Sequence, residues 1–389
     1  MSADQPTLNV AEAVRSRYSR AAQEQEPSLC CPVTYDPQRM KVIPAEILER
    51  DYGCGDPSQH LQPGDRVLDL GSGGGKICYI AAQVVGPDGY VIGVDVNDEM
   101  LNLARQYQQE VGDRIGYHNT EFRKGRIQDL RLDLDQFDEF LRQNPAGSVS
   151  DWLIAVETAD QLRREQPMIP DESIDAVVSN CVLNLVDPES RLQLFAEIHR
   201  VLNDGGRAVI SDIVSDEDVP AELQNDPELW SGCLSGAFRE DRFLTAFEQA
   251  GFHGVEILAR QEEPWAVIDG IEFRSLTVRA WKQCDTDERD RHQAVIYHGP
   301  WKAVMDDAGQ ELLRGERIAV SDRAFERYQR APYVGQMTFL SPTDAVSDDE
   351  AEEFTPRETQ HRDPQQSKFH SNGLNILPEG DCCGTTGCC

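Results

Sequence analysis

The segment VLDLGSGGGK, residues 67–76, decides how the central part of this chain folds. The apolar residues of VLDL are typical of a buried β-strand, and the residues after the loop predict a helix from Lys76 to Val85. Between them, glycines at 71 and 73–75 let the backbone turn sharply and approach a ligand at the N-terminus of the helix. This order of strand, glycine-rich loop and helix predicts the first unit of a nucleotide-binding α/β fold.

Strands and helices continue to alternate after this segment, which is the signature of a parallel sheet covered by helices. Two late apolar runs, HGVEILAR and IEFRSLTVRAWK, are separated by a short polar stretch and predict an antiparallel hairpin at the sheet edge. The expected strands are 66–70, 90–95, one starting in 120–130, 174–179, 207–214, 253–260 and 271–282, and the expected helices between them are 76–85, 98–111 and 188–206.

Composition changes divide the chain into four regions. Residues 1–60 form an N-terminal helical lid region with an amphipathic helix at 10–23, and residues 61–283 form the main α/β domain. Residues 284–340 predict a small β-rich appendage, and the acidic, polar residues 341–389 predict a disordered tail that ends in DCCGTTGCC. Within the main domain, residues 131–170 form a polar insert with a helical pattern, which we expect to be a solvated excursion.

Charge and cysteine content argue against several classes of protein. The net charge of −32 disfavours nucleic-acid binding, which normally shows a basic face, and an adaptation to solubility or salt is the favoured explanation of the acidity. No run reaches the ~18 apolar residues of a membrane helix, and the N-terminus does not resemble a signal peptide. The odd number of cysteines, 11, argues against a disulfide framework. The sequence therefore predicts a cytoplasmic protein with reduced thiols and no membrane partner.

Acidic residues at the ends of the first two strands indicate which nucleotide the loop holds. Asp95 closes the second strand, where a carboxylate accepts hydrogen bonds from ribose hydroxyls. The loop GSGGGK lacks the third glycine of the dinucleotide motif, and Asp69 stands directly before it. With the late hairpin, this pattern from Asp65 to Lys282 resembles the class I S-adenosylmethionine (SAM) methyltransferases, which implies a Rossmann-like sheet. The resemblance implies SAM-binding residues at Asp69, Gly71, Ser72, Gly73, Asp95, Val96, Arg126, Ile127 and Asn180.

Several cysteines follow predicted strands or lie in the N-terminal lid region. Cys181, in SNCVLNLV, follows the fourth strand, and Cys233, in ELWSGCLSGAF, follows the fifth. Ligands of open α/β sheets lie beyond the carboxyl ends of strands, so both thiols are expected near the methyl donor. Cys54 and the pair Cys30 and Cys31 come from the lid region. A buried structural cysteine is the alternative for Cys181, but several converging thiols favour a soft acceptor, because thiolates prefer soft partners.

Four cysteine and loop contexts, YGCG, DLGSGGGKICY, SNCVLNLV and LWSGCLSGA, closely resemble those of the arsenite methyltransferases. The resemblance extends from about Cys30 to Pro332, and the CCGTTGCC tail also has counterparts in the family. It implies that arsenite, a metalloid substrate, is bound by Cys54, Cys181 and Cys233, with Cys30 or Cys31 as a fourth thiol in product exchange or redox relay. It also implies a thiol reductant, thioredoxin or glutathione. Two departures are a shorter spacing from Cys31 to Cys54 and a longer insert at 131–170.

Two other functions are compatible with the same motifs. A metalloid-binding protein on this scaffold would bind arsenite without turnover, although the intact Asp69, glycine loop and Asp95 favour a working donor site. A methyltransferase for a small organic molecule, such as a quinone or a lipid, would use the cysteines only structurally. Cys78 and Cys284 are expected to pack in the core.

Overall fold

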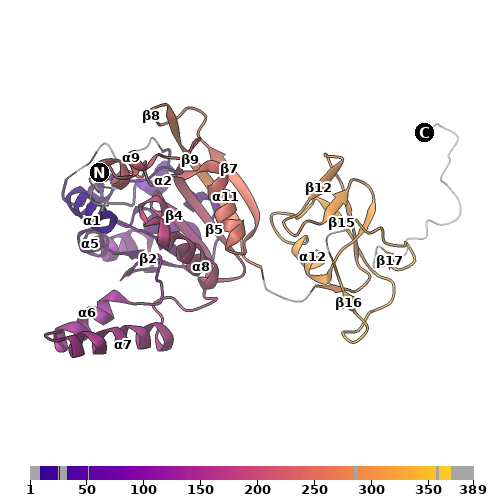
Figure 1. The fold of residues 1–389 in the computed structure, drawn as a ribbon, viewed down its shortest axis with the longest axis horizontal. Helices are drawn as coiled ribbons and strands as arrows, with labels where there is room; N and C mark the ends of the chain where they lie inside the picture. Colours follow the sequence, from indigo (N-terminus) through magenta and orange to yellow (C-terminus); the bar gives the residue numbers. More distant parts are fainter. Residues whose placement is uncertain are drawn as a thin grey trace, which may run out of the picture. The chain divides into compact units, whose positions relative to one another are not determined.

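The computed structural model describes residues 9–24, 26, 33–50, 52–283, 288–355 and 359–368. The chain forms two compact units, Met1–Cys284 and Asp285–Cys389, each with its own hydrophobic core (Figure 1). The first unit contains the glycine-rich loop and the three cysteines Cys54, Cys181 and Cys233, so the proposed chemistry belongs to this unit.

A nine-stranded sheet forms the centre of the first unit, with the main strand order β3-β2-β1-β4-β5-β9-β7. The first five strands of this order are parallel, and β9 runs antiparallel to both β5 and β7. This arrangement confirms the expected class I methyltransferase sheet and its antiparallel edge hairpin. The strands are β1 (Arg66–Leu70), β2 (Tyr90–Asp95), β3 (Thr120–Lys124), β4 (Ile174–Asn180), β5 (Leu202–Ser215), β6 (Phe238–Arg239), β7 (His253–Arg260), β8 (Ala266–Ile268) and β9 (Ile271–Trp281).

Both faces of the sheet are buried, which explains why its strands are almost continuously apolar. On one face, α8 (Arg191–Val201) and α11 (Glu240–Gln249) contribute Phe195 and Phe247 to a large apolar cluster. On the other, α4 (Lys76–Val85) and α5 (Asp98–Ile115) contribute Ile77 and Leu101. The helix expected at 76–85 begins and ends at those residues. Because helices cover both faces of the sheet, a ligand is expected to bind beyond the carboxyl ends of the strands.

The expected boundary between α8 and β5 is wrong. The helix was expected to continue to residue 206, but α8 ends at Val201 and β5 begins at Leu202. Leu202 pairs with Ile174 of β4, and the register then shifts before Arg207. Gly205 has a φ of 73°, which a right-handed helix cannot contain. Strand pairing therefore replaces the last helical turn.

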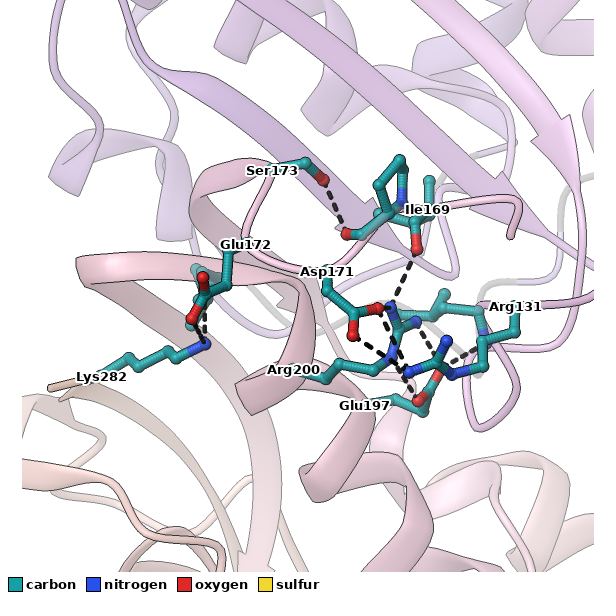
Figure 2. A network of polar contacts seen from close by, with 11 residues as sticks. Arg131, Ile169, Asp171, Glu172, Ser173, Glu197, Arg200 and Lys282 are labelled. Atoms are coloured by element: carbon teal, nitrogen blue, oxygen red, sulfur yellow. Dashed lines mark hydrogen bonds and ion pairs between the residues drawn. The ribbon is translucent and has the colours of Figure 1, made fainter. Parts of the chain in front are cut away.

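The insert at 131–170 is helical, as expected. It contains α6 (Leu134–Gln143) and α7 (Val149–Glu165), which project from the sheet in Figure 1. Figure 2 shows the network at its base, where Arg200 of α8 donates to Asp171 (2.6 Å) and Glu197 (2.7 Å). Arg131 also pairs with Asp171, so the network ties both ends of the insert to the domain. Most α6 and α7 side chains are solvated, including the apolar Trp152.

Short helices lie N-terminal to β1, and the first of them lies near the carboxyl ends of the strands. Helix α1 (Val10–Ala21) lies against both α5 and α10 (Pro227–Ser231). Arg17 donates to the carbonyl of Glu228 (2.6 Å), and Asn97 donates to Ser19 Oγ (3.0 Å). The other short helices are α2 (Pro37–Met40), α3 (Ala45–Glu49), η2 (Pro57–His60), η3 (Leu183–Leu185), η4 (Pro188–Ser190) and α9 (Ala221–Gln224). Among the described residues, no helix has the length and hydropathy to cross a membrane.

Where the structure describes it, the second unit is built from short antiparallel strands and one helix. Its largest sheet has the order β14-β11-β15-β17, and its core contains Tyr297, Ile318 and Tyr328. Its elements are β10 (Arg289–Asp290), β11 (Ala294–Tyr297), β12 (Ala303–Met305), β13 (Glu311–Leu313), β14 (Arg317–Ala319), α12 (Asp322–Arg327), β15 (Met337–Pro342), β16 (Glu352–Glu353) and β17 (Ser367–Lys368).

The prediction that the chain is disordered from residue 341 onward is wrong for residues 341–355 and 359–368. Strands β16 and β17 pair with β10 and β15, and Phe354 and Arg362 are buried. Arg362 donates to Asp290 (2.6 Å), so polar side chains hold a segment that has few apolar residues. Residues 369–389, which include the CCGTTGCC tail, lie outside the described residues.

Candidate active site

The glycine-rich loop joins β1 to α4 and is fastened to the end of β2. The backbone N–H of Gly71 donates to the carbonyl of Val94 (2.8 Å), and that of Gly73 donates to the Asp95 carboxylate (2.9 Å). Asn97 N–H donates to the other Asp95 oxygen (2.8 Å). Partial burial raises the pKa of Asp95, while these N–H groups oppose the shift. The glycine-rich loop and Asp95, which the sequence suggested separately, are therefore joined by hydrogen bonds.

The residues around this loop fit a bound SAM. The hydroxyl of Ser72 is buried and has no hydrogen-bond partner among the described residues, which is unusual for a buried hydroxyl. A Cβ placed on Gly73 would meet nothing within 4 Å, so space is open at the loop. Val96 is 46% exposed at the end of β2, and Ile127 is buried after the adjacent β3. Both side chains are apolar, as expected of residues that would contact an adenine ring, and Arg126, next to Ile127 in the chain, is exposed.

Asp69 is buried at the end of β1 and faces α4. The thiol of Cys78 donates to its carboxylate (3.1 Å). Burial, followed by the nearby Asp69 charge, raises the pKa of Cys78 well above its ordinary value. Cys78 is therefore a protonated core thiol, which agrees with the packing role expected for it, and it helps to orient Asp69.

The two turns that carry Cys181 and Cys233 meet beyond the end of β4 and alongside the last residues of β5. Cys181 follows β4 directly, and its N–H donates to the carbonyl of Ser211 on β5 (2.7 Å). Cys233 follows α10, and its thiol donates to the carbonyl of Cys181 (3.0 Å). The Sγ atoms of Cys54 and Cys181 and a carboxylate oxygen of Asp212 all lie within 4.8 Å of one another. The structure thus brings together the three cysteines expected from separate parts of the sequence.

The turn that carries one member of the thiol cluster (Cys54, Cys181 and Cys233) also packs against the donor loop. A Cβ placed on Gly71, whose φ is 68°, would lie 2.3 Å from the side chain of Val182, the residue after Cys181. Any larger residue at 71 would therefore push the Cys181 turn away from the loop. Close packing at this point sets the distance between the two halves of the site.

The thiols of Cys181 and Cys233 are held in their protonated forms in the free protein. For Cys181, a hydrogen bond with Cys233 lowers the pKa, but contact with Cys54 and desolvation raise it well above its ordinary value. For Cys233, the contact with Cys181 and then burial raise the pKa. Both thiols must lose their protons when they bind a metalloid, because the thiolate is the ligand.

Cys54 is held over the sheet by a network centred on Asn180. The Asn180 side-chain oxygen accepts from the N–H groups of Cys54 (2.9 Å) and Gly55 (3.1 Å), and its amide donates to the Gly55 carbonyl (2.8 Å). Ser275 of β9 donates to the carbonyl of Cys54 (2.5 Å). Asn180, expected to contact SAM, therefore uses its amide in this structure to hold the Cys54 segment.

Cys30 and Cys31, the candidates for a fourth thiol, lie outside the described residues, as do Cys284 and the tail cysteines. Tyr52, between Cys31 and Cys54 in the chain, donates to the carbonyl of Ala21 (3.1 Å) and so anchors α1.

Sequence reasoning missed the side chains that cover and support the thiols. Tyr18 of α1 hydrogen-bonds to Cys233, and desolvation raises the pKa of this tyrosine. Asp212 of β5 is fully buried beneath the Cys181 turn, and desolvation raises its pKa to about 7. An acid inside the apolar strand AVISDIV was the one signal available for Asp212. A tyrosine on an amphipathic helix gave no such signal.

Comparisons with known proteins agree with this geometry. Residues 61–251 match a methyltransferase domain family, and residues 285–372 match a domain of unknown function. The crystal structure of CrArsM, an arsenic(III) SAM methyltransferase from Chlamydomonas reinhardtii, superposes with a TM-score of 0.53 and 25% sequence identity, covering 81% of this chain and 99% of that one.

Arsenite methyltransferases from several organisms are similar in sequence to this chain. The one from Aquipseudomonas alcaligenes is 31% identical over 74% of this chain and 77% of its own length, and that from Mus musculus is 27% identical over 92% and 88%. The one from Halobacterium salinarum is 35% identical over 60% of this chain but only 49% of its own length, so the match spans about half of that relative. On the extent and level of these similarities, the chain belongs to the arsenite methyltransferase family.

Proposed function

We propose that this protein transfers methyl groups from SAM to trivalent arsenic, first to arsenite and then to methylarsenite. Cys54, Cys181 and Cys233 bind the arsenic as thiolates. The observation that carries the proposal is the gathering of these thiols from three separate parts of the chain, at a turn whose Val182 packs against the loop expected to hold the donor. A methyltransferase for a carbon, oxygen or nitrogen acceptor has no need of such a set.

The residues of this chain position the two reactants. The sulfonium of SAM supplies the methyl group, and the arsenic lone pair forms the new bond to carbon as the carbon–sulfur bond breaks. No proton leaves the attacking atom, so the site requires no general base. Its contribution is orientation, which can lower a barrier by roughly 7–11 kcal/mol. On the donor side, Asp95 and the 71–73 loop hold the nucleoside; on the acceptor side, the three thiolates fix the arsenic.

Repeated turnover requires a reductant, because methyl transfer formally oxidises arsenic by two electrons. We propose that a thiol supplies these electrons, either thioredoxin or glutathione, and that Cys30 or Cys31 relays them or exchanges the product. This chemistry fits the cytoplasm, where thiols remain reduced.

A methylation assay tests the proposal. The protein is incubated with arsenite, SAM and a dithiol, and arsenic species are separated by chromatography with element-specific detection. We expect methylarsenite first and dimethylated arsenic later. A protein that binds arsenite and SAM without forming methylated arsenic would instead be a metalloid-binding protein. Turnover of a quinone or lipid acceptor, with none of arsenite, would assign the cysteines to a structural role.

A further inference from the structure

Cys181 and Cys233 have an unusual backbone conformation. Five non-glycine residues within the described ranges have positive φ, and two of them are Cys181 (64°) and Cys233 (62°). This left-handed conformation is unfavourable for a side chain with a Cβ, so it persists only where surrounding contacts impose it. Both strained residues belong to the thiol cluster. The contacts that hold their backbones in this conformation therefore also position their thiols.

Asp212 supplies these contacts for the Cys181 turn. It is fully buried on β5, and one carboxylate oxygen accepts the N–H groups of Leu183 (2.8 Å) and Asn184 (3.4 Å). The other oxygen accepts from the Asn184 side chain (2.8 Å) and from Ile213 N–H (2.8 Å). Four donors engage the two oxygens, so this carboxylate supports the turn and is not available as a ligand of the substrate.

Asn184 extends the support to the second turn. Its side-chain amide also donates to the carbonyls of Ile213 (2.7 Å) and Cys233 (3.3 Å). The Oδ1 atom of Asn184 is buried and accepts no hydrogen bond from the described residues. Leaving a buried acceptor unpaired costs free energy. Arg191 donates to the carbonyls of Asn184 (3.3 Å) and Gly236 (2.6 Å), which ties the same two turns together from the α8 side.

We propose that Asp212 and Asn184 are positioning residues that hold Cys181 and Cys233 at the separation at which both bind one arsenic atom. The inference rests on the proposed function, because it assigns these residues to the same site. It explains why a carboxylate and an amide occupy an apolar strand and turn, and why a buried amide oxygen is left without a partner. The pair fixes the backbone of both cysteines before the substrate arrives.

Two variants test this role. Asp212→Asn replaces an acceptor by an amide that cannot accept all four donors, and Asn184→Ala removes the link to the Cys233 turn but keeps the backbone N–H groups. X-ray absorption at the arsenic edge counts the bound sulfur atoms in each variant, and titrations give the dissociation constants of arsenite and SAM. We expect three sulfur atoms in the unaltered protein and fewer in both variants. We expect arsenite affinity to fall on the order of tenfold or more, while SAM affinity stays within twofold.

Asp65→Asn is the matched control. Asp65 is also a buried aspartate, and it pairs with Arg207 and accepts from Gln62 N–H (2.6 Å) at the opposite end of the sheet. This variant should lower the melting temperature yet keep three sulfur atoms on arsenic, which separates positioning from general stability.

The possible outcomes are distinct. Three sulfur atoms and unchanged arsenite affinity in a folded Asp212→Asn or Asn184→Ala protein would overturn the inference. If Asp212→Asn does not fold, Asn184→Ala decides alone. Fewer than three sulfur atoms in the unaltered protein would overturn the proposed three-cysteine site itself.

Discussion

At the scale of single residues, Asp95 links the donor loop to the sheet. Its carboxylate already accepts the N–H groups of Gly73 and Asn97, and the ribose hydroxyls of SAM are its expected further donors. In Asp95→Ala the lost charge-assisted hydrogen bonds cost roughly 1.5–3 kcal/mol, so the SAM dissociation constant should rise at least tenfold. Isothermal titration measures the SAM dissociation constant, and the variant should still bind arsenite. Asp88→Ala, in an exposed turn at the other end of β2, should leave the constant unchanged.

The three cysteines are not equivalent, because they are held by different parts of the chain. Arsenite offers three positions to thiolates, whereas methylarsenite has used one on carbon. Cys181 and Cys233 are fixed together beyond the sheet, while Cys54 comes from the N-terminal segment and is held by Asn180. Cys181→Ser and Cys233→Ser should abolish turnover of both substrates, since a hard hydroxyl cannot replace a thiolate.

Cys54→Ser should lose arsenite turnover but retain much of its activity on methylarsenite. Assays of all three serine variants with both substrates decide the point. Equal residual activities, or full activity in Cys181→Ser, would show that Cys181 is a packing residue.

The raised thiol pKa values make the free site slow to alkylate. Contact with Cys54 and desolvation raise the pKa of Cys181, so little thiolate exists near neutral pH. We expect its alkylation by iodoacetamide to keep accelerating above roughly pH 8.5, the ordinary thiol pKa. Mass spectrometry of the labelled peptide measures the rate against pH. A plateau below that pH would show a thiolate stabilised in the free protein.

At the scale of elements, the strands of the sheet could be located well from the sequence, because buried strands are local apolar runs. The glycine loop and α4 were located correctly, since glycine content and an apolar run mark both. The start of β5 was missed because Leu202 becomes a strand residue only by pairing with Ile174. The support of the Cys181 turn by Asp212 was missed for a similar reason, because the turn follows β4, Asp212 lies on β5, and the two meet only in the folded sheet.

Helix α1 covers the thiol cluster. Tyr18 hydrogen-bonds to Cys233, and Arg17 fastens the helix to Ser231 of α10 (3.0 Å). Deleting residues 1–24 should therefore expose Cys233, which is 2% accessible, and raise its reactivity with a thiol reagent on the order of tenfold or more. Tyr18→Phe keeps the helix and should raise the reactivity much less. An unchanged rate in the deletion variant would mean that α1 does not shield the site.

At the scale of the whole molecule, every described residue of the proposed site lies in the first unit. The described part of the second unit extends through residue 368, although its last strands are only two residues long and its last described segment is polar. Composition alone could not reveal this, because Arg362 holds the segment to Asp290 and to the carbonyl of Gln293 through its side chain. Side-chain hydrogen bonds between distant segments leave no periodic pattern in the sequence.

Two truncations test how far the folded chain extends. A protein ending at Lys368 keeps every described residue and should retain its melting temperature and its methylation rate at saturating thiol. A protein ending at Leu340 loses the buried Phe354 and Arg362. Removing a buried Phe side chain alone costs about 3–5 kcal/mol, so the second unit should unfold or become sensitive to protease.

The first unit should still bind SAM and arsenite in both truncated proteins, because its site residues precede Cys284. Limited proteolysis with mass spectrometry locates the cleavages, and titration gives both affinities. Protease resistance of residues 288–340 in the protein ending at Leu340 would show that the last strands are dispensable. Loss of turnover in the protein ending at Lys368, with both affinities intact, would instead place the tail cysteines in the catalytic cycle.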